Sequence, residues 1–146
     1  MNALNKKYLI SITGLQNDGQ NEEEISLTTT GGFSEQDGGY FITYLEGEDF
    51  GTQDTTTTLA VHPDQIHIIR DGGVQSKMIL QKGKRHLCAY DTGFGHMMVG
   101  ICAERIQSDL TLSGGELDFS YAMDINSEFT GTNHIHISVK ECTSCL

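Results

Sequence analysis

Hydrophobic and polar residues alternate along most of the chain with a period of two. The clearest run places Leu117, Phe119 and Tyr121 on one side, continued by Met123 and Ile125, with polar or small residues between them. Successive side chains of a strand point to opposite faces, so such a run is typical of a half-buried strand. The same alternation predicts further strands at residues 8–12, 24–30, 40–46, 52–61, 65–70, 74–81, 85–92, 95–106 and 135–139.

The connections between these runs are short and contain glycine, which accepts the positive φ angles of tight hairpin turns. Successive hairpins give an antiparallel meander, because a parallel sheet would need long crossovers. One segment, residues 106–113, fits either a helix or a wide connection. The predicted turns lie at residues 37–39, 71–73, 82–83, 114–115 and 131–132.

A meander of about ten strands leaves two exposed edges unless it closes on itself. We therefore expect an all-β, antiparallel, up-and-down barrel of about 8–10 strands. At 146 residues the chain fits one domain. We expect that domain to span residues 1–146, with a core at about 8–140 and short tails. A sandwich of two sheets is the alternative architecture.

The composition narrows the classes of partner. A formal net charge of −11 argues against binding nucleic acid or an anionic membrane. The chain has no apolar stretch long enough to span a bilayer, and residues 1–7 do not resemble a signal peptide. We expect a cytoplasmic protein without a cofactor, whose four cysteines are reduced. Cys88 and Cys102 fall in predicted strands and are expected to be small core residues.

Six short segments occur in an order and spacing that resemble one family. They are YLEGE (44–48), G followed by TTTT (51–58), IHIIRDG (66–72), YDTGFG (90–95), GELDFSY (115–121) and GTN (131–133). Together they resemble the YwiB family of uncharacterised bacterial proteins, described as calycin-like β-barrels, over roughly residues 8–140. The resemblance implies a closed barrel related in shape to lipocalins and fatty-acid-binding proteins. It implies no activity, because the family has none assigned.

Arg70 is the polar residue that the pattern singles out first. It follows Ile66 and Ile68 at intervals of two residues, so on a strand all three side chains point to the same face. Its guanidinium therefore points inward if the two isoleucines do. A buried arginine needs an anion, and its planar fork suits a carboxylate or phosphate. The candidates are Glu46 or Glu104 of the chain itself, or the head group of a ligand.

Barrels of this size either hold one small ligand or are filled by their own side chains. The first interpretation is a non-enzymatic barrel that binds a small apolar or anionic molecule. Four methionines at positions 78, 97, 98 and 123 would give it a soft lining. The ligand-binding candidates are Arg70, Tyr44, Tyr90 and Tyr121.

Two other functions stay open. Residues 40–45 are apolar on both faces, so Phe41 and its neighbours fit the interface of a homodimer whose barrel core is filled. An enzyme is the third possibility, since paired carboxylates can act as general acid and base, although a charged turn is by far the commoner explanation of such a cluster. No catalytic residue is assigned. The clustered carboxylates are Glu46, Glu48, Asp49 and Asp54.

A zinc site is a further hypothesis. His134 and His136 share one face of a strand, and Cys142 and Cys145 follow, so the four could form a tetrahedral set. The spacing does not match a zinc knuckle, however, and an ordinary polar outer face explains the histidines. The CxxC pair does not begin a helix, so redox catalysis is not expected there, although air oxidation can join the two thiols in a terminal disulfide.

Overall fold

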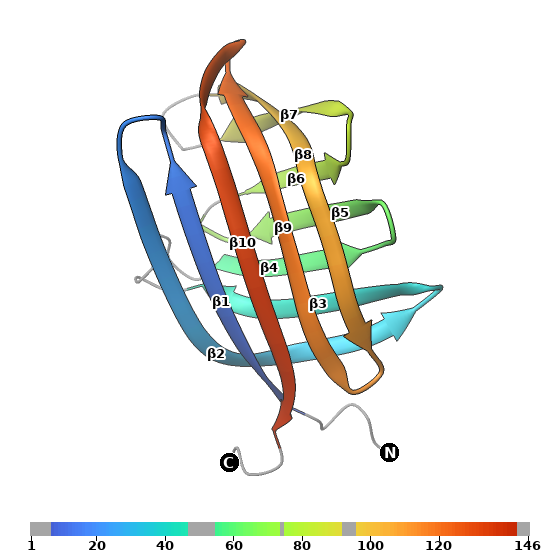
Figure 1. Ribbon diagram of the computed structural model, residues 1–146. Helices are drawn as coiled ribbons and strands as arrows, with labels where there is room; N and C mark the ends of the chain where they lie inside the picture. The colour runs from blue at the N-terminus through green and yellow to red at the C-terminus, as the bar shows by residue number, and fades with distance from the viewer. Residues whose placement is uncertain (1–6, 47–54, 74, 92–95, 143–146) are drawn as a thin grey trace.

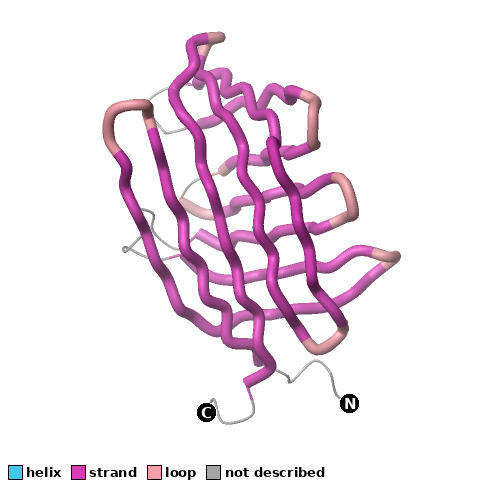
Figure 2. Tube along the Cα trace, in the orientation of Figure 1, coloured by secondary structure: helices cyan, strands magenta, loops and turns pink. Residues whose placement is uncertain are grey.

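The computed structural model describes residues 7–46, 55–73, 75–91 and 96–142, without the side chains of residues 90, 91 and 96. These ranges form ten strands and no helix, which confirms the all-β prediction (Figure 2). The described chain therefore contains no helix that is long and apolar enough to cross a membrane. The strands are β1 (Lys7–Asn17), β2 (Glu22–Gln36), β3 (Gly39–Glu46), β4 (Thr55–Val61), β5 (Gln65–Asp71), β6 (Ser76–Gln81), β7 (Arg85–Asp91), β8 (His96–Thr111), β9 (Gly114–Ile125) and β10 (Glu128–Cys142).

The strands form one antiparallel sheet in the order β6-β5-β4-β3-β2-β1-β10-β9-β8-β7. The first and last strands pair with each other, so the meander closes at its ends. The break in the barrel lies instead between β6 and β7, which are consecutive in the chain. In the described residues two isolated bridges lie near this seam: Gln81 pairs with Lys84 across the β6–β7 turn, and Lys82 of that turn pairs with Ala103 of β8. The barrel is therefore nearly closed, and its two edges face each other.

The sheet folds into two crossing layers (Figure 1). The front layer contains β1, β8, β9, β10 and the first part of β2, and the back layer contains β3–β6. The long strand β2 belongs to both, because residues 22–31 pair with β1 and residues 32–36 with β3. The partner changes after Gly31, where a Cβ atom would lie 2.2 Å from the carbonyl oxygen of Thr43. Only glycine fits this corner.

The core fills the space between the layers with the inward residues of the alternating runs. Cys88 is buried there, as expected. Cys102 is only half-buried, because it lies between the inward-facing Ile101 and Ala103 on β8 and points the other way. The fully buried large side chains include Ile10, Ile42, Leu59, Ile66, Leu80, Ile101, Leu117, Phe119 and Ile137.

Several predicted turns are confirmed, and two are wrong. Asp37 and Gly38 form a hairpin turn with φ angles of 53° and 80°, as a type I′ turn requires. Gly131, predicted in a turn, instead lies inside β10 at a bulge, where a Cβ would come within 2.3 Å of the Asn17 carbonyl oxygen. The actual turn between β9 and β10 is Asn126–Ser127, in which both residues have positive φ. Similarly, residues 114–115 begin β9 rather than forming the turn.

The possible helix at residues 106–113 is also wrong, because β8 continues to Thr111. A bulge between Ala103 and Arg105 shifts the register, so that Ala103 and Ile106 both face inward, followed by Leu110. Inward positions three and four residues apart resemble the period of a helix. The two-residue alternation was therefore not visible in this segment, and its strand was not predicted.

Candidate functional site: a cavity at one end of the barrel

A buried polar cluster is centred on Glu46, the last residue of β3. Its side chain is 1% exposed, and its Oε2 accepts a hydrogen bond of 2.7 Å from Thr57 Oγ1. Arg70 Nε donates to the same oxygen at 3.3 Å, and Tyr44 OH lies 3.5 Å from it. The strand register explains this meeting, since Tyr44, Thr57 and Arg70 are direct partners in one row across β3, β4 and β5.

The charges of this cluster are matched within the barrel. Arg70 is always protonated and keeps 25% of its side chain exposed, whereas Glu46 is almost fully enclosed. Burial, followed by the neighbouring Glu46 carboxylate, raises the pKa of Tyr44 above its ordinary value. The phenol therefore stays protonated and can donate to Glu46.

The structure settles the predicted partner of Arg70. Ile66 and Ile68 are buried, and Arg70 points inward with them to meet Glu46. Glu104, the other candidate, is exposed at the bulge of β8. The internal salt bridge is therefore the correct interpretation.

A cavity of about 320 Å³ adjoins this cluster at the end of the barrel that carries the β1–β2 and β9–β10 turns. Its volume lies near the lower end of the ~300–1,000 Å³ typical of small-molecule sites. The walls are mostly apolar, with a few polar groups among them. Its lining consists of Ile12, Gly14, Gln16, Ile25, Glu46, Arg70, Met78, Met97, Val99, Tyr121, Met123, Ile125, Asn133 and Ile135.

Two polar side chains near the cavity have unfilled hydrogen-bonding capacity among the described residues. Asn133 is 7% exposed, and its amide nitrogen meets a sulfur, Met123 Sδ, at 4.0 Å as its hydrogen-bond partner. Ser76 Oγ is buried without a hydrogen-bond partner in the described chain, and Ser76 pairs directly with Arg70 across β5 and β6. Buried polar groups normally find partners, and of these two only Asn133 lines the cavity, where a ligand would supply one.

The predicted tyrosines fall in different places. Tyr121 lines the cavity and stacks on Phe119 with ring centroids 6.3 Å apart. Tyr44 contacts Glu46 but does not line the cavity. The side chain of Tyr90 lies outside the described residues. Met78, Met97 and Met123 line the cavity, whereas Met98 is 44% exposed on the other face of β8.

Asn133, Gln16, Thr57 and Ser76 were missed from the sequence. Asn133 could have been found in the same way as Arg70. It lies two and four residues before Ile135 and Ile137, so on a strand its side chain points to the same face as theirs. A polar residue at an inward position was the available signal.

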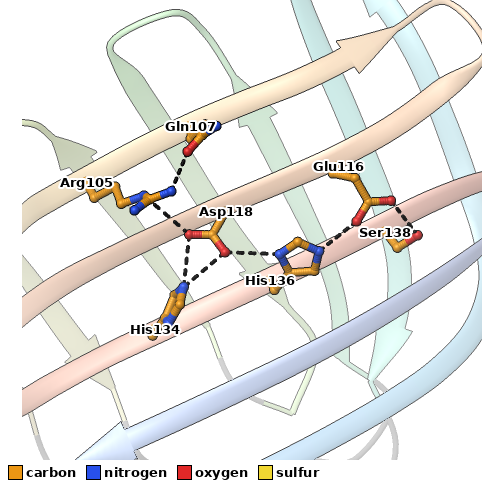
Figure 3. Close-up of polar contacts among 7 residues, drawn as sticks. All are labelled: Arg105, Gln107, Glu116, Asp118, His134, His136 and Ser138. Atoms are coloured by element: carbon orange, nitrogen blue, oxygen red, sulfur yellow. Dashed lines mark hydrogen bonds and ion pairs between the residues drawn. The ribbon is translucent and has the colours of Figure 1, made fainter.

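A second polar cluster covers the outside of β8–β10 (Figure 3). Asp118 lies at its centre and accepts from His134 Nε2 at 2.9 and 3.0 Å and from His136 Nδ1 at 3.0 Å. Arg105 Nε lies 3.6 Å from the same carboxylate. Glu116 lies 2.6 Å from His136 Nε2. The remaining contacts are Ser138 Oγ to Glu116 at 3.0 Å, and Arg105 to Gln107.

Both ring nitrogens of His136 thus face carboxylates. The hydrogen bond to Asp118, followed by that to Glu116, raises the pKa of His136 above its ordinary value. The bond from His136 in turn lowers the pKa of Glu116. Burial alone would raise the pKa of Asp118, but hydrogen bonds from His136 and His134 together lower it. Each ionisable group is engaged by another, so this network links three strands and is best described as structural.

The zinc hypothesis gains no support from the geometry. Within the described residues, no group of three or more His, Cys, Asp or Glu side chains is arranged to hold a metal ion. His134 and His136 both turn toward Asp118. Cys142 is disulfide-bonded, so the expectation that all four cysteines are reduced is wrong, and Cys145 lies outside the described residues. Of the acidic cluster considered for catalysis, Glu46 points into the barrel, while residues 48, 49 and 54 lie outside the described part.

Comparison with known proteins confirms the family resemblance. The chain matches the family described as "Domain of unknown function (DUF1934)" over residues 10–137. Its fold is similar to the crystal structure of the ywiB protein from Bacillus subtilis, with a TM-score of 0.84 and 20% sequence identity. The match covers 94% of this chain and 93% of that one. At this identity the likeness shows the fold alone. No curated protein matches the chain.

Proposed function

Because the chain belongs to the DUF1934 family, whose description names no activity, we propose a function from its geometry: reversible binding of a small, mostly apolar molecule with one uncharged polar group. The binding site is the 320 Å³ cavity at the end of the barrel. An apolar cavity with a few convergent polar groups is the usual form of a small-molecule site. We further propose that the barrel acts as calycin-like barrels do, holding its ligand inside.

The charge balance of the cavity favours a neutral ligand. Arg70 would attract an anion if it were alone, but its charge is matched by Glu46 at 3.3 Å. A carboxylate entering the cavity would approach the nearly buried Glu46 and would have to displace it from Arg70. The anionic ligand considered from the sequence is therefore the less favoured alternative.

Asn133 is the observation that carries the proposal. Its amide lines the cavity, is nearly buried and meets only a weak sulfur acceptor in the described chain. An amide offers both a donor and an acceptor, so it would pair with a carboxamide, a hydroxyl or an N–H group of a ligand. Met78, Met97 and Met123 supply polarisable contacts that suit an aromatic body.

A cytoplasmic setting accords with this proposal. Cys88 and Cys102 are free thiols, which suits a reducing compartment, whereas the disulfide at Cys142 does not.

The neutral fluorescent probe N-phenylnaphthylamine tests the proposal, since it is aromatic and carries one N–H group. We expect its fluorescence to rise on titration with the protein. Asn133→Leu should weaken binding about 2–10-fold, the effect of one hydrogen bond. Ile135→Trp should abolish binding by filling the cavity, whereas Phe129→Trp, on the same strand at a 65% exposed position, should leave binding unchanged. A folded wild-type protein that does not bind the probe, or equal binding by all variants, would overturn the proposal.

A further inference from the structure

The outer face of the back layer differs from the rest of the surface in composition. The inward residues of β3–β6 alternate with a second set that points away from the core. We call this second set the β3–β6 outer face. It consists of Phe41, Thr43, Leu45, Thr56, Thr58, Ala60, Gln65, His67, Ile69, Asp71, Lys77, Ile79 and Gln81.

The strand register makes this face continuous. Phe41, Ala60, His67 and Ile79 are successive partners in one row across the four strands. The next row contains the exposed side chain of Ile69, at 39%. Apolar and threonine side chains thus form a single surface rather than scattered contacts.

The face is also electrically neutral in an acidic protein. It carries one anion and one cation, Asp71 and Lys77, whereas the chain has a formal net charge of −11. Burial, followed by Lys77, lowers the pKa of His67, so this histidine is uncharged at neutral pH. The outer surface of the front layer, in contrast, carries the charged network around Asp118 (Figure 3).

We propose that the β3–β6 outer face is the interface of a homodimer. Two copies of this chain repel each other, so they can associate only where like charges are absent, and this face meets that condition. Because every copy presents the same neutral face, the contact closes as a two-fold dimer. A partner selected by charge would bind elsewhere.

The area of the face determines how tightly we expect the dimer to associate. Four strands, with seven residues each in β4 and β5, span roughly 20 Å by 23 Å, or about 450 Å². A standard interface buries about 800 Å² on each partner. We therefore expect a weak dimer that dissociates in the micromolar range.

Sedimentation velocity over about 1–300 µM protein tests this interface. The wild type should shift from monomer to dimer with concentration. Ile69→Glu and Ile69→Lys should each raise the dissociation constant at least tenfold. Using both signs separates burial of a charge from a change in net charge, because only Glu adds to the repulsion. Leu112→Glu and Leu112→Lys, in the 71% exposed turn before β9, are the controls and should dimerise like the wild type.

Three results would overturn the proposal. These are a wild type that stays monomeric throughout, Ile69 variants that dimerise normally, and Leu112 variants that fail to dimerise. Circular dichroism and N-phenylnaphthylamine binding should be unchanged in the Ile69 variants, because the face lies outside the cavity. The dimer and the ligand site are thereby tested separately.

Discussion

Arg70 Nε lies 3.3 Å from Glu46 Oε2 inside the barrel, although the two residues are 24 positions apart in the chain. The pair ties the end of β3 to the end of β5 and borders the cavity. It also makes that cavity nearly neutral, and the proposed ligand class follows from this neutrality.

Replacing Arg70 by Met should destabilise the protein, because it leaves the Glu46 carboxylate enclosed without its cation. Breaking a fully buried pair costs about 3–5 kcal/mol. We expect about 2–4 kcal/mol, since solvent still reaches a quarter of Arg70. Urea unfolding measures the change. The double variant Glu46→Gln, Arg70→Met should recover much of the loss, and a double variant less stable than the single one would contradict the assignment.

Much of this pair could be predicted from the sequence. The two-residue spacing of Ile66, Ile68 and Arg70 predicted that the guanidinium points inward, because every second side chain of a strand points to the same face. The choice of Glu46 over Glu104 could not be predicted, since it depends on a bulge in β8 that exposes Glu104.

Other features of the fold depend on contacts between neighbouring strands, which the alternation of apolar and polar residues does not predict. Gly131 is required by the approach of the Asn17 carbonyl from a neighbouring strand, not by a turn. The turn that does occur uses Asn126 and Ser127, without a glycine. The seam between β6 and β7 arises because β1 pairs with β10 and the layers cross, which is a property of the whole sheet.

Gly131→Ala should be strongly destabilising. The new Cβ would lie 2.3 Å from the Asn17 carbonyl oxygen, at a φ of 145° that side-chain-bearing residues rarely adopt. Strain of this kind costs about 1–3 kcal/mol, and the steric overlap adds to it. Gly32→Ala is the matched control, because a Cβ atom at Gly32 would meet no other atom within 4 Å, and the change should cost under about 1 kcal/mol. Equal effects in thermal unfolding would show that the close contact at Gly131 is absent.

Ser127→Gly should stabilise the β9–β10 hairpin. Ser127 has a φ of 72°, which costs a residue with a side chain about 1–2 kcal/mol, and Asn-Gly is a preferred type I′ pair. Glycine also gains freedom in the unfolded chain, so the net gain should be about 0.5–1 kcal/mol. A lower midpoint of urea unfolding would contradict the turn assignment.

The network around His136 predicts a specific pH dependence. The folded pKa of His136 is raised above 6.5, so its contribution is complete below pH 6.5 and is lost as pH rises through the folded pKa. The pKa of Glu116 is lowered from 4.5, so its contribution is present above that value and is lost as pH falls through the folded pKa.

The stability measured by urea unfolding across the neutral range should therefore contain a part that falls with increasing pH through His136, whereas His67, whose pKa is lowered, contributes with the opposite sign. His136→Gln should remove that part of the slope, while His86→Gln, on β7, should retain it. NMR titration of His136 gives the folded pKa directly. A value below 6.5 would be inconsistent with carboxylates at both ring nitrogens.

The central claim is that the cavity holds a small neutral molecule, and native mass spectrometry tests it most directly. Wild type and Ile135→Trp are purified side by side under mild conditions and measured before and after saturation with N-phenylnaphthylamine. The wild type should carry a non-covalent adduct, as purified or with the probe, and Ile135→Trp should carry none. Bare wild-type protein in both spectra, or the same adduct on the filled variant, would contradict the claim.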